Sequence, residues 1–234
     1  MRKVELSLEI IRYGLKMSRN PCLVWSGGKD STVMLYLTLK VCRKENLKIP
    51  IILACDPIPI PENREYCLRL AKMWDLDIIL WEDILKDDDF NDINDVITCC
   101  RKLKVEPLKR FIRENYIDVL FVAIRHDEHP ERAKEVFFSI RTNPPHVRVH
   151  PILHWTWLDV WLFIKQENIP INPLYLKGYT SLGCDPCTEP VVPNGFKSVD
   201  EIIEYVRTHR GEERKGRSID KELVMEKLRR LGYF

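Results

Sequence analysis

The sequence lacks any apolar run close to the ~18 residues that a transmembrane helix requires. Charged residues, Arg2, Lys3 and Glu5, interrupt the start of the chain, where a secretion signal would need an apolar segment. Strong net charge is also missing, because 37 Lys and Arg residues are balanced by 35 Asp and Glu residues. We therefore expect a cytoplasmic protein with no membrane association, and no nucleic-acid binding that depends on overall charge alone.

Glycine is scarce, with 9 residues in 234, and no internal repeat or low-complexity tract occurs. Hydrophobic residues make up 45% of the chain and charged residues 31%, which is the balance of an ordinary globular protein. The composition thus excludes fibrous and disordered classes. We expect one main core.

Short apolar runs alternate with helical patterns along the first two thirds of the chain. The expected strands are 22–25, 51–55, 78–81 and 119–122, and the expected helices are 4–17, 30–42, 61–74, 156–166, 199–209 and 219–231. The acidic stretch 82–95 and the proline-rich stretch 169–194 are expected to be mostly loop. Strands that alternate with helices predict an α/β fold with a doubly wound parallel sheet.

Residues 26–32 read Ser-Gly-Gly-Lys-Asp-Ser-Thr and lie between an expected strand and an expected helix. Two glycines let the backbone bring bare N–H groups close to an anion, and the helix N-terminus and Lys29 add positive charge. The spacing differs from the Gly-x4-Gly-Lys loop of kinases and GTPases. The segment predicts a binding site for a pyrophosphate group.

This segment resembles the PP-loop of the ATP pyrophosphatase superfamily, whose members cleave ATP between the α and β phosphates and form AMP or an adenylate. The resemblance implies that the loop holds ATP, usually with Mg²⁺. The implied ATP-binding residues of the loop are Ser26, Gly27, Gly28, Lys29, Asp30, Ser31 and Thr32.

The eight cysteines divide into four that stand singly and two pairs. Cys22, Cys42, Cys55 and Cys67 lie in apolar or mixed runs and are expected to be buried thiols. Cys99 with Cys100, and Cys184 with Cys187, are clustered, and clustered thiolates repel one another unless a cation holds them. An iron–sulfur cluster, Zn²⁺ and thiols without metal remain open at this point.

Two families share further stretches with the chain. Residues 99–109 and 183–188 resemble the two cysteine segments of adenylylsulfate (APS) reductases, which implies a [4Fe-4S] cluster on Cys99, Cys100, Cys184 and Cys187. Residues 123–134, 213–220 and 225–234 resemble the small, ATP-binding subunit of sulfate adenylyltransferases. Together these likenesses place most of residues 20–234 in the phosphoadenosine phosphosulfate (PAPS) reductase superfamily.

Two departures separate the chain from the reductases. They use a nucleophilic cysteine near the C-terminus, whereas no cysteine follows Cys187 here. Their phosphate loop is usually degenerate, whereas residues 26–32 are intact. An intact ATP loop combined with a cluster resembles a third group, the ATP-dependent sulfur-insertion enzymes that thiolate tRNA or make phosphorothioate DNA.

Arginines complete the predicted site, because guanidinium groups match tetrahedral oxyanions. We expect Arg132 and Arg214 to contact ATP or adenylate, and Lys29, Arg125 and Arg217 to act in catalysis. Asp56 follows an expected strand end, where ligands gather in open α/β sheets. Asp127 and Glu128 are expected to pair with Arg132 rather than to bind Mg²⁺. The polar loop 210–217 is expected to close over the nucleotide as a lid.

The sequence therefore predicts an ATP-cleaving adenylyl-transfer enzyme of sulfur metabolism. The alternatives are a [4Fe-4S] APS/PAPS reductase, a sulfur-insertion enzyme that would need a nucleic acid partner, and a non-catalytic nucleotide sensor. A partner subunit or a homo-oligomer is consistent with each. We expect an N-terminal helix over 1–20, a nucleotide-binding core over 21–150, and a C-terminal part over 151–234 that carries the Cys-x2-Cys loop and the nucleotide-closing tail.

Overall fold

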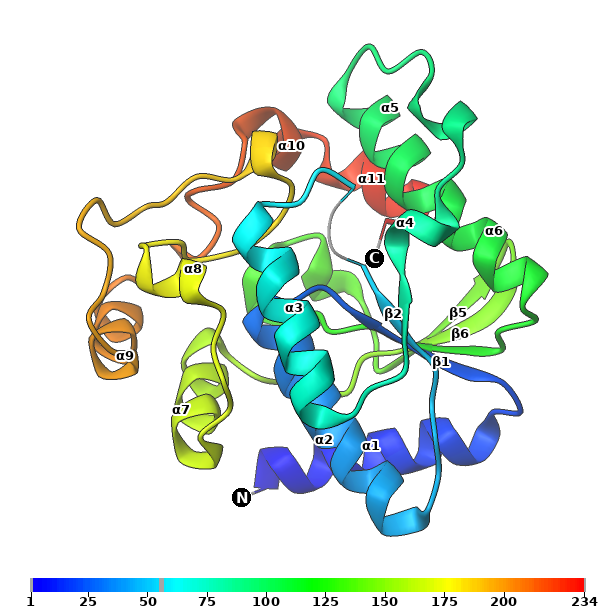
Figure 1. The fold of residues 1–234 in the computed structure, drawn as a ribbon, viewed down its shortest axis with the longest axis horizontal. Coiled ribbons are helices and arrows are strands. Elements are labelled where there is room, and N and C mark those ends of the chain that lie inside the picture. Colours follow the sequence, from blue (N-terminus) through cyan, green and yellow to red (C-terminus); the bar gives the residue numbers. More distant parts are fainter. Residues whose placement is uncertain (1, 55–56, 234) are drawn as a thin grey trace.

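A six-stranded sheet forms the centre of the molecule in the computed structural model, which describes residues 2–54 and 57–233 (Figure 1). The strand order is β3-β2-β1-β4-β6-β5, and all neighbours are parallel except β5 and β6. The strands are β1 (Pro21–Trp25), β2 (Ile51–Leu53), β3 (Ile78–Leu80), β4 (Val119–Phe121), β5 (Phe138–Thr142) and β6 (Pro145–Val149). The predicted doubly wound α/β sheet is confirmed.

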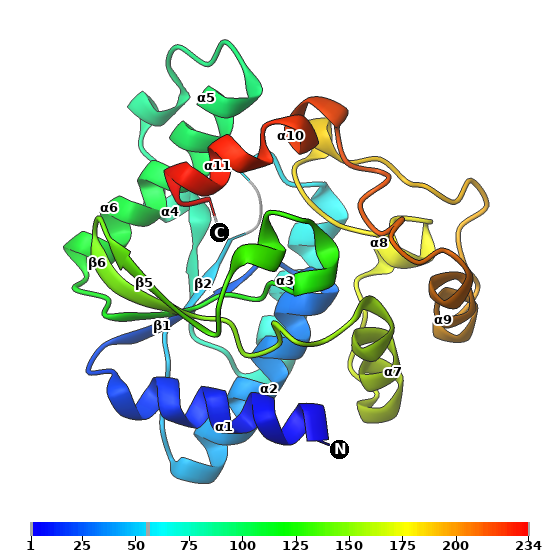
Figure 2. The same ribbon diagram turned by 180° about the vertical axis from the view of Figure 1, so that it is seen from behind.

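Helices cover both faces of this sheet (Figures 1 and 2). They are α1 (Arg2–Met17), α2 (Lys29–Glu45), α3 (Pro61–Trp74), α4 (Trp81–Ile84), α5 (Val96–Cys100), α6 (Glu106–Glu114), α7 (Trp157–Glu167), α8 (Pro173–Leu176), α9 (Val199–Thr208), α10 (Ile219–Leu223) and α11 (Met225–Leu231). A π-helical turn over Arg101–Val105 joins α5 to α6.

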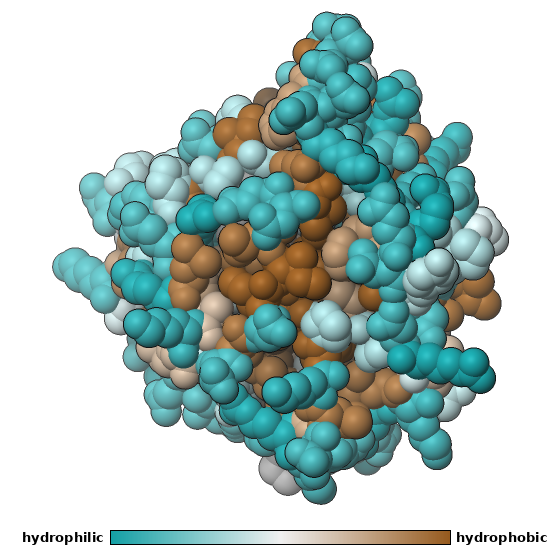
Figure 3. Space-filling model, turned by 45° about the vertical axis from the view of Figure 1, so that its right-hand side comes forward, coloured by the Kyte–Doolittle hydropathy of each residue, from teal (hydrophilic) through white to brown (hydrophobic). Residues whose placement is uncertain are grey.

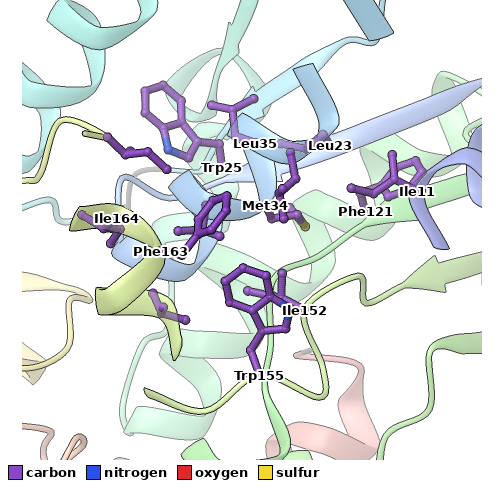
Figure 4. Close-up of a cluster of buried hydrophobic side chains, with 14 of the residues drawn as sticks. Ile11, Leu23, Trp25, Met34, Leu35, Phe121, Ile152, Trp155, Phe163 and Ile164 are labelled. Carbon is purple, nitrogen blue, oxygen red and sulfur yellow. The ribbon is translucent and has the colours of Figure 1, made fainter. Parts of the chain in front are cut away.

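The core is divided by the sheet, because successive side chains of a strand point to opposite faces. In β1, Leu23 and Trp25 pack with α1, α2 and α7, whereas Cys22 packs on the other face toward α4 and α6. Figure 4 shows the first cluster, in which Trp25, Met34 and Phe163 are among the labelled side chains. Complete burial of such a side chain contributes about 1.5–3 kcal/mol to stability. Packing on both faces of the sheet therefore holds β1, and with it the start of the loop that follows, in place.

Several segments differ from the sequence expectations. The hairpin β5–β6 was not expected; its edge strand β5 has no continuous apolar run, and Ile140 is 80% exposed. The helix expected over 219–231 is interrupted at Val224, and the expected loops contain α4 and α8. A continuous helical stretch also carries Cys99 and Cys100, where we had predicted no element. Apart from this stretch, which runs on through α6, these are short elements, which tertiary contacts stabilise more than local sequence does.

Most of the surface in Figure 3 is hydrophilic, with apolar side chains gathered near the middle of the face shown. Across the described part of the chain, no helix is both long and apolar enough to span a bilayer. The sheet itself indicates where a ligand would bind. The strand order reverses between β1 and β4, and ligands of open α/β sheets bind beyond the carboxyl ends of the strands at such a point.

Candidate active site

The segment 26–28 leaves β1 at this reversal point and leads directly into α2. Gly27 has φ +77°, and a Cβ there would lie 2.3 Å from Asn63 Oδ1 and 2.4 Å from Cys67 Sγ. Glycine is therefore required on both conformational and steric grounds. The amide of Thr32 donates to the carbonyl of Gly28 at 2.9 Å and closes the first turn of α2.

Hydroxyl groups hold the loop in shape. Ser26 Oγ and Ser31 Oγ are 3.0 Å apart, and the Ser31 hydroxyl donates to the carbonyl of Gly28 at 2.9 Å. Trp25 Nε1 donates to Thr32 Oγ1 at 3.0 Å. All these side chains come from residues predicted for the phosphate loop or from the strand before it, so part of the loop's order comes from its own sequence.

Two neighbours that sequence reasoning did not identify also support the loop. The amide of Lys29 donates to the Tyr175 hydroxyl at 2.8 Å, and Asn63 Nδ2 donates to the carbonyl of Ser26 at 3.2 Å. Asn172 in turn donates to Asn63 Oδ1 at 2.7 Å. These residues come from α3 and the segment around α8, and no local pattern linked them to the loop.

Four charged side chains form a buried network beside the loop. Lys29 Nζ binds Asp30 Oδ2 at 2.9 Å and also binds the Glu213 carboxylate, and Arg125 binds both Asp30 and Glu213. The side chains of Lys29, Arg125 and Glu213 are 2%, 0% and 5% exposed, which excludes a solvated surface cluster. The predicted residues Lys29, Asp30 and Arg125 are thus brought together, and Glu213 joins them from the C-terminal part.

The electrostatics of the network favour its charged cations. Burial disfavours the ammonium of Lys29, but the Asp30 and Glu213 carboxylates outweigh it and raise the pKa of Lys29 above its ordinary value. The pKa of Arg125 is raised by the same two carboxylates against burial. For Glu213, burial raises the pKa of the carboxyl group, and the two cations oppose this only in part.

Glu128 pairs with Arg132, as predicted, whereas Asp127 pairs with Arg125 instead. Glu128 accepts from Arg132 Nη1 at 2.7 Å and from the backbone amide of Arg125 at 2.9 Å. Arg125 Nε donates to Asp127 at 3.0 Å, and the amide of Trp157 donates to the same carboxylate at 2.6 Å. Although burial acts in the other direction, Arg132 and Arg125 lower the pKa of Glu128 below its ordinary range.

Three carboxylates of this region, on Asp30, Glu128 and Glu213, have oxygen atoms within 4.8 Å of one another. Oxygen donors in this number suit Mg²⁺. Here they bind Lys29, Arg125 and Arg132, so a cation would require some of these ion pairs to open.

A cavity of about 220 Å³ opens over the loop. Its polar lining is Ser26, Gly28, Lys29, Asp30, Ser31, Lys104, Glu128, Arg132, Tyr175, Ser181, Arg214, Arg217 and Tyr233, and its apolar lining includes Val24, Ala54, Trp81, Leu108, Val122, Ala123 and Ile124. A polar floor with an apolar wall suits a nucleotide, whose phosphates and base differ in polarity. Arg132, Arg214 and Arg217 line the same cavity as the loop, and their contact with a nucleotide stays a prediction. Asp56 lies outside the described residues.

The segment 210–221, which we call the tail, contributes buried side chains to this region. Arg217 is 7% exposed, and its Nη1 donates to Thr188 Oγ1 at 2.9 Å. Arg214 donates to Glu222 at 2.6 and 2.9 Å. Within the predicted lid over 210–217, Glu213 and Arg217 are buried, because Glu213 binds the cations Lys29 and Arg125 and Arg217 binds the Thr188 hydroxyl.

The two cysteine pairs lie near each other beside this tail. Burial and the neighbouring thiols of Cys100 and Cys187 raise the pKa of Cys99, so charges from both pairs act on one sulfur. The amide of Ser218 donates to the carbonyl of Cys187 at 3.1 Å, and residues Thr188 and Arg217 form an antiparallel bridge. The tail therefore contacts the phosphate loop through Glu213. Through residues 217–218 it contacts the segment 184–189, which we call the cysteine loop.

The spacing of the sulfur atoms bears on the metal. A single Zn²⁺ with Zn–S bonds of ~2.3 Å would bring its sulfurs to within ~3.8 Å of one another. No three of the four sulfurs, all in described residues, lie within 4.8 Å of one another. The four sulfurs are therefore not gathered around one point as a single Zn²⁺ would require, and four thiolates are also the donor set of a [4Fe-4S] cluster.

The chain is similar in sequence to proteins of known families. Residues 20–190 match the family model of the phosphoadenosine phosphosulfate reductase domain. Subunit 2 of the sulfate adenylyltransferase of Zymomonas mobilis is 29% identical, with 100% of this chain and 97% of the relative covered.

Solved structures share the fold at lower identity. A Candida glabrata FMN adenylyltransferase bound to FMN and an ATP analogue has a TM-score of 0.65 at 21% identity, over 81% of this chain and 65% of that one. A tRNA thiolase of Methanococcus maripaludis with its [4Fe-4S] cluster has a TM-score of 0.54 at 14% identity, over 99% of this chain and 80% of that one.

Proposed function

Because the chain belongs to the phosphoadenosine phosphosulfate reductase domain family, we propose that it binds ATP on residues 26–32 and transfers the adenylyl group to an acceptor. The acceptor oxygen attacks the α phosphorus, the bond from that phosphorus to the α,β-bridging oxygen breaks, and pyrophosphate leaves with the electron pair. Sulfate is the acceptor that we favour. Its attack would yield adenylyl sulfate.

The observation that carries this proposal is the pair of buried cations, Lys29 and Arg125, at the N-terminus of α2. Both are bound to carboxylates of Asp30 and Glu213. A departing pyrophosphate develops negative charge that such preorganised cations stabilise. The β and γ phosphates would take the place of the Glu213 carboxylate on these two cations.

Sulfate would bind to arginines of the same cavity. Arg132, Arg214 and Arg217 line it, and guanidinium groups bind tetrahedral oxyanions through paired N–H donors. The sulfate adenylyltransferase relatives, aligned over nearly the whole chain, support this choice. Because those relatives are named as subunits, we also propose that a partner chain completes the enzyme.

We propose further that Cys99, Cys100, Cys184 and Cys187 hold a [4Fe-4S] cluster, with Mg²⁺ accompanying ATP. Such a cluster would supply a site where sulfur binds or electrons pass. The spacing of the sulfur atoms favours it over Zn²⁺, and the fold-related tRNA thiolase carries one. The likeness to this thiolase favours a second candidate function, ATP-dependent sulfur insertion into a nucleic acid.

Replacement of Lys29 tests the ATP-cleaving step. We expect Lys29→Ala to lower the rate of pyrophosphate release from ATP by at least about 10²-fold, the scale on which loss of one preorganised charge acts. Lys40→Ala is the matched control, because Lys40 lies on the same helix with its side chain 55% exposed. Pyrophosphate release at the wild-type rate from folded Lys29→Ala protein would remove Lys29 from the reaction.

A further inference from the structure

We propose that Lys221 is a positioning residue of the cysteine site, where its ammonium group balances the negative charge of cysteine thiolates and the cluster they hold. This inference rests on the proposed cluster. It concerns a residue that lies outside the nucleotide cavity and that neither the phosphate loop nor the predicted arginines involve.

The burial of Lys221 is the first observation. Its side chain is 0% exposed, and its Nζ has no hydrogen-bond partner among the described residues. The ring of Tyr233, with its centroid 5.1 Å from Nζ, makes a cation–π contact. A buried ammonium that lacks a paired anion costs several kcal/mol, and one aromatic contact of up to about 2 kcal/mol does not offset this cost. The site therefore calls for an anion.

The position of Lys221 identifies which anion is near. It lies on α10, which packs against α5, the helix that ends at Cys100. Just before α10, the amide of Ser218 donates to the carbonyl of Cys187. Both cysteine segments therefore adjoin the helix that carries Lys221.

The next helix closes the same region. Met225 and Leu228 of α11 pack with Cys100 in one apolar cluster. Lys221 is absent from the lining of the nucleotide cavity, whereas Lys104 is part of it. The ammonium of Lys221 thus lies on the side of the cysteine segments and not in the cavity proposed for the ATP phosphates.

The charge of the bound group supplies the chemical reason. Four thiolates contribute four negative charges, which exceed the positive charge of the usual oxidised cluster core, so the assembly is an anion. In an environment without water, such an anion is stabilised by nearby hydrogen-bond donors and positive charge. Mutation of residues that surround the metal ligands usually lowers metal affinity by about 10–100-fold. Lys221 offers both.

The test compares Lys221→Met with wild type and with Lys221→Arg, which keeps the charge. All are purified without oxygen, analysed for iron, sulfide and zinc, and then exposed to an iron chelator. We expect wild type to contain iron and sulfide, Lys221→Met to release iron at least about tenfold faster, and Lys221→Arg to stay close to wild type. Lys227→Met on the exposed side of α11 is the surface control.

A second measurement separates this role from simple packing. After the metal is removed, the thermal midpoint of Lys221→Met should equal or exceed that of wild type, because methionine removes an unpaired buried charge. A packing role alone would instead lower it. Equal iron release from wild type and Lys221→Met would overturn the role of Lys221 and leave the cluster standing, whereas wild-type protein without iron would overturn the cluster and this inference together.

Discussion

Glu213 connects the tail to the phosphate loop through a single side chain. Its carboxylate binds both Lys29 and Arg125, while its own backbone carbonyl accepts from the Thr180 hydroxyl at 2.8 Å. Loss of one partner from a buried ion network commonly costs about 3–5 kcal/mol. Glu213 is therefore a stabilising residue of the site without ATP and a competitor of the phosphates that we propose to bind there.

This dual role predicts an unusual response of Glu213→Gln. We expect its free energy of unfolding to fall by about 3 kcal/mol without nucleotide, and we expect added ATP to raise its thermal midpoint more than it raises that of wild type, because phosphates supply the missing negative charge. Glu212→Gln, which alters a surface pair with Lys215, is the control. Thermal unfolding with and without ATP gives the answer, and a smaller ATP effect in Glu213→Gln than in wild type would contradict the competition.

At the scale of elements, the tail and the cysteine loop form one unit. The amide of Glu189 donates to the carbonyl of Gly216 at 2.9 Å, and a Cβ on Gly216 would lie 2.3 Å from the Glu189 carbonyl oxygen. A methyl group there must push two backbones apart. At Gly211, in the same tail, a Cβ would meet no atom within 4 Å.

These two glycines give a matched pair of variants. We expect Gly216→Ala to separate the tail from the cysteine loop, to increase protease cleavage within 210–220 and to lower ATP turnover at least tenfold. We expect Gly211→Ala to cost only the strain of its φ of +83°, about 1 kcal/mol, with turnover near wild type. Limited proteolysis and pyrophosphate release measure both, and identical behaviour of the two variants would show that this contact is dispensable.

The same elements show what the sequence could and could not predict. The phosphate loop was predictable because its residues, Ser26 to Thr32, are consecutive in the sequence. The backbone at residue 27, with φ +77°, requires a glycine, and that glycine can be seen in the sequence. The positions of Glu213 and Lys221 were not predictable. Glu213 binds Lys29, which is 184 residues away in the sequence, and Lys221 is buried between short helices. The division of the chain at residue 150 remains a prediction, as does the coordination by the four cysteines.

At the scale of the whole molecule, one sheet presents two chemical centres to a common tail. The order reversal between β1 and β4 positions the phosphate loop. The tail connects this loop with the cysteine segment through Glu213, Arg217 and Ser218. In such an arrangement, the state of one centre can influence the other through contiguous contacts. The proposed chemistry at the α phosphate is the premise of this view.

Analysis of the phosphorus-containing products tests that premise most directly. The protein, purified without oxygen, is incubated with ATP, Mg²⁺ and sulfate, and the products are identified by ³¹P NMR. Our account predicts one pyrophosphate for each ATP consumed, together with adenylyl sulfate or AMP. Formation of ADP and orthophosphate would contradict it, because those products require cleavage at the γ phosphate.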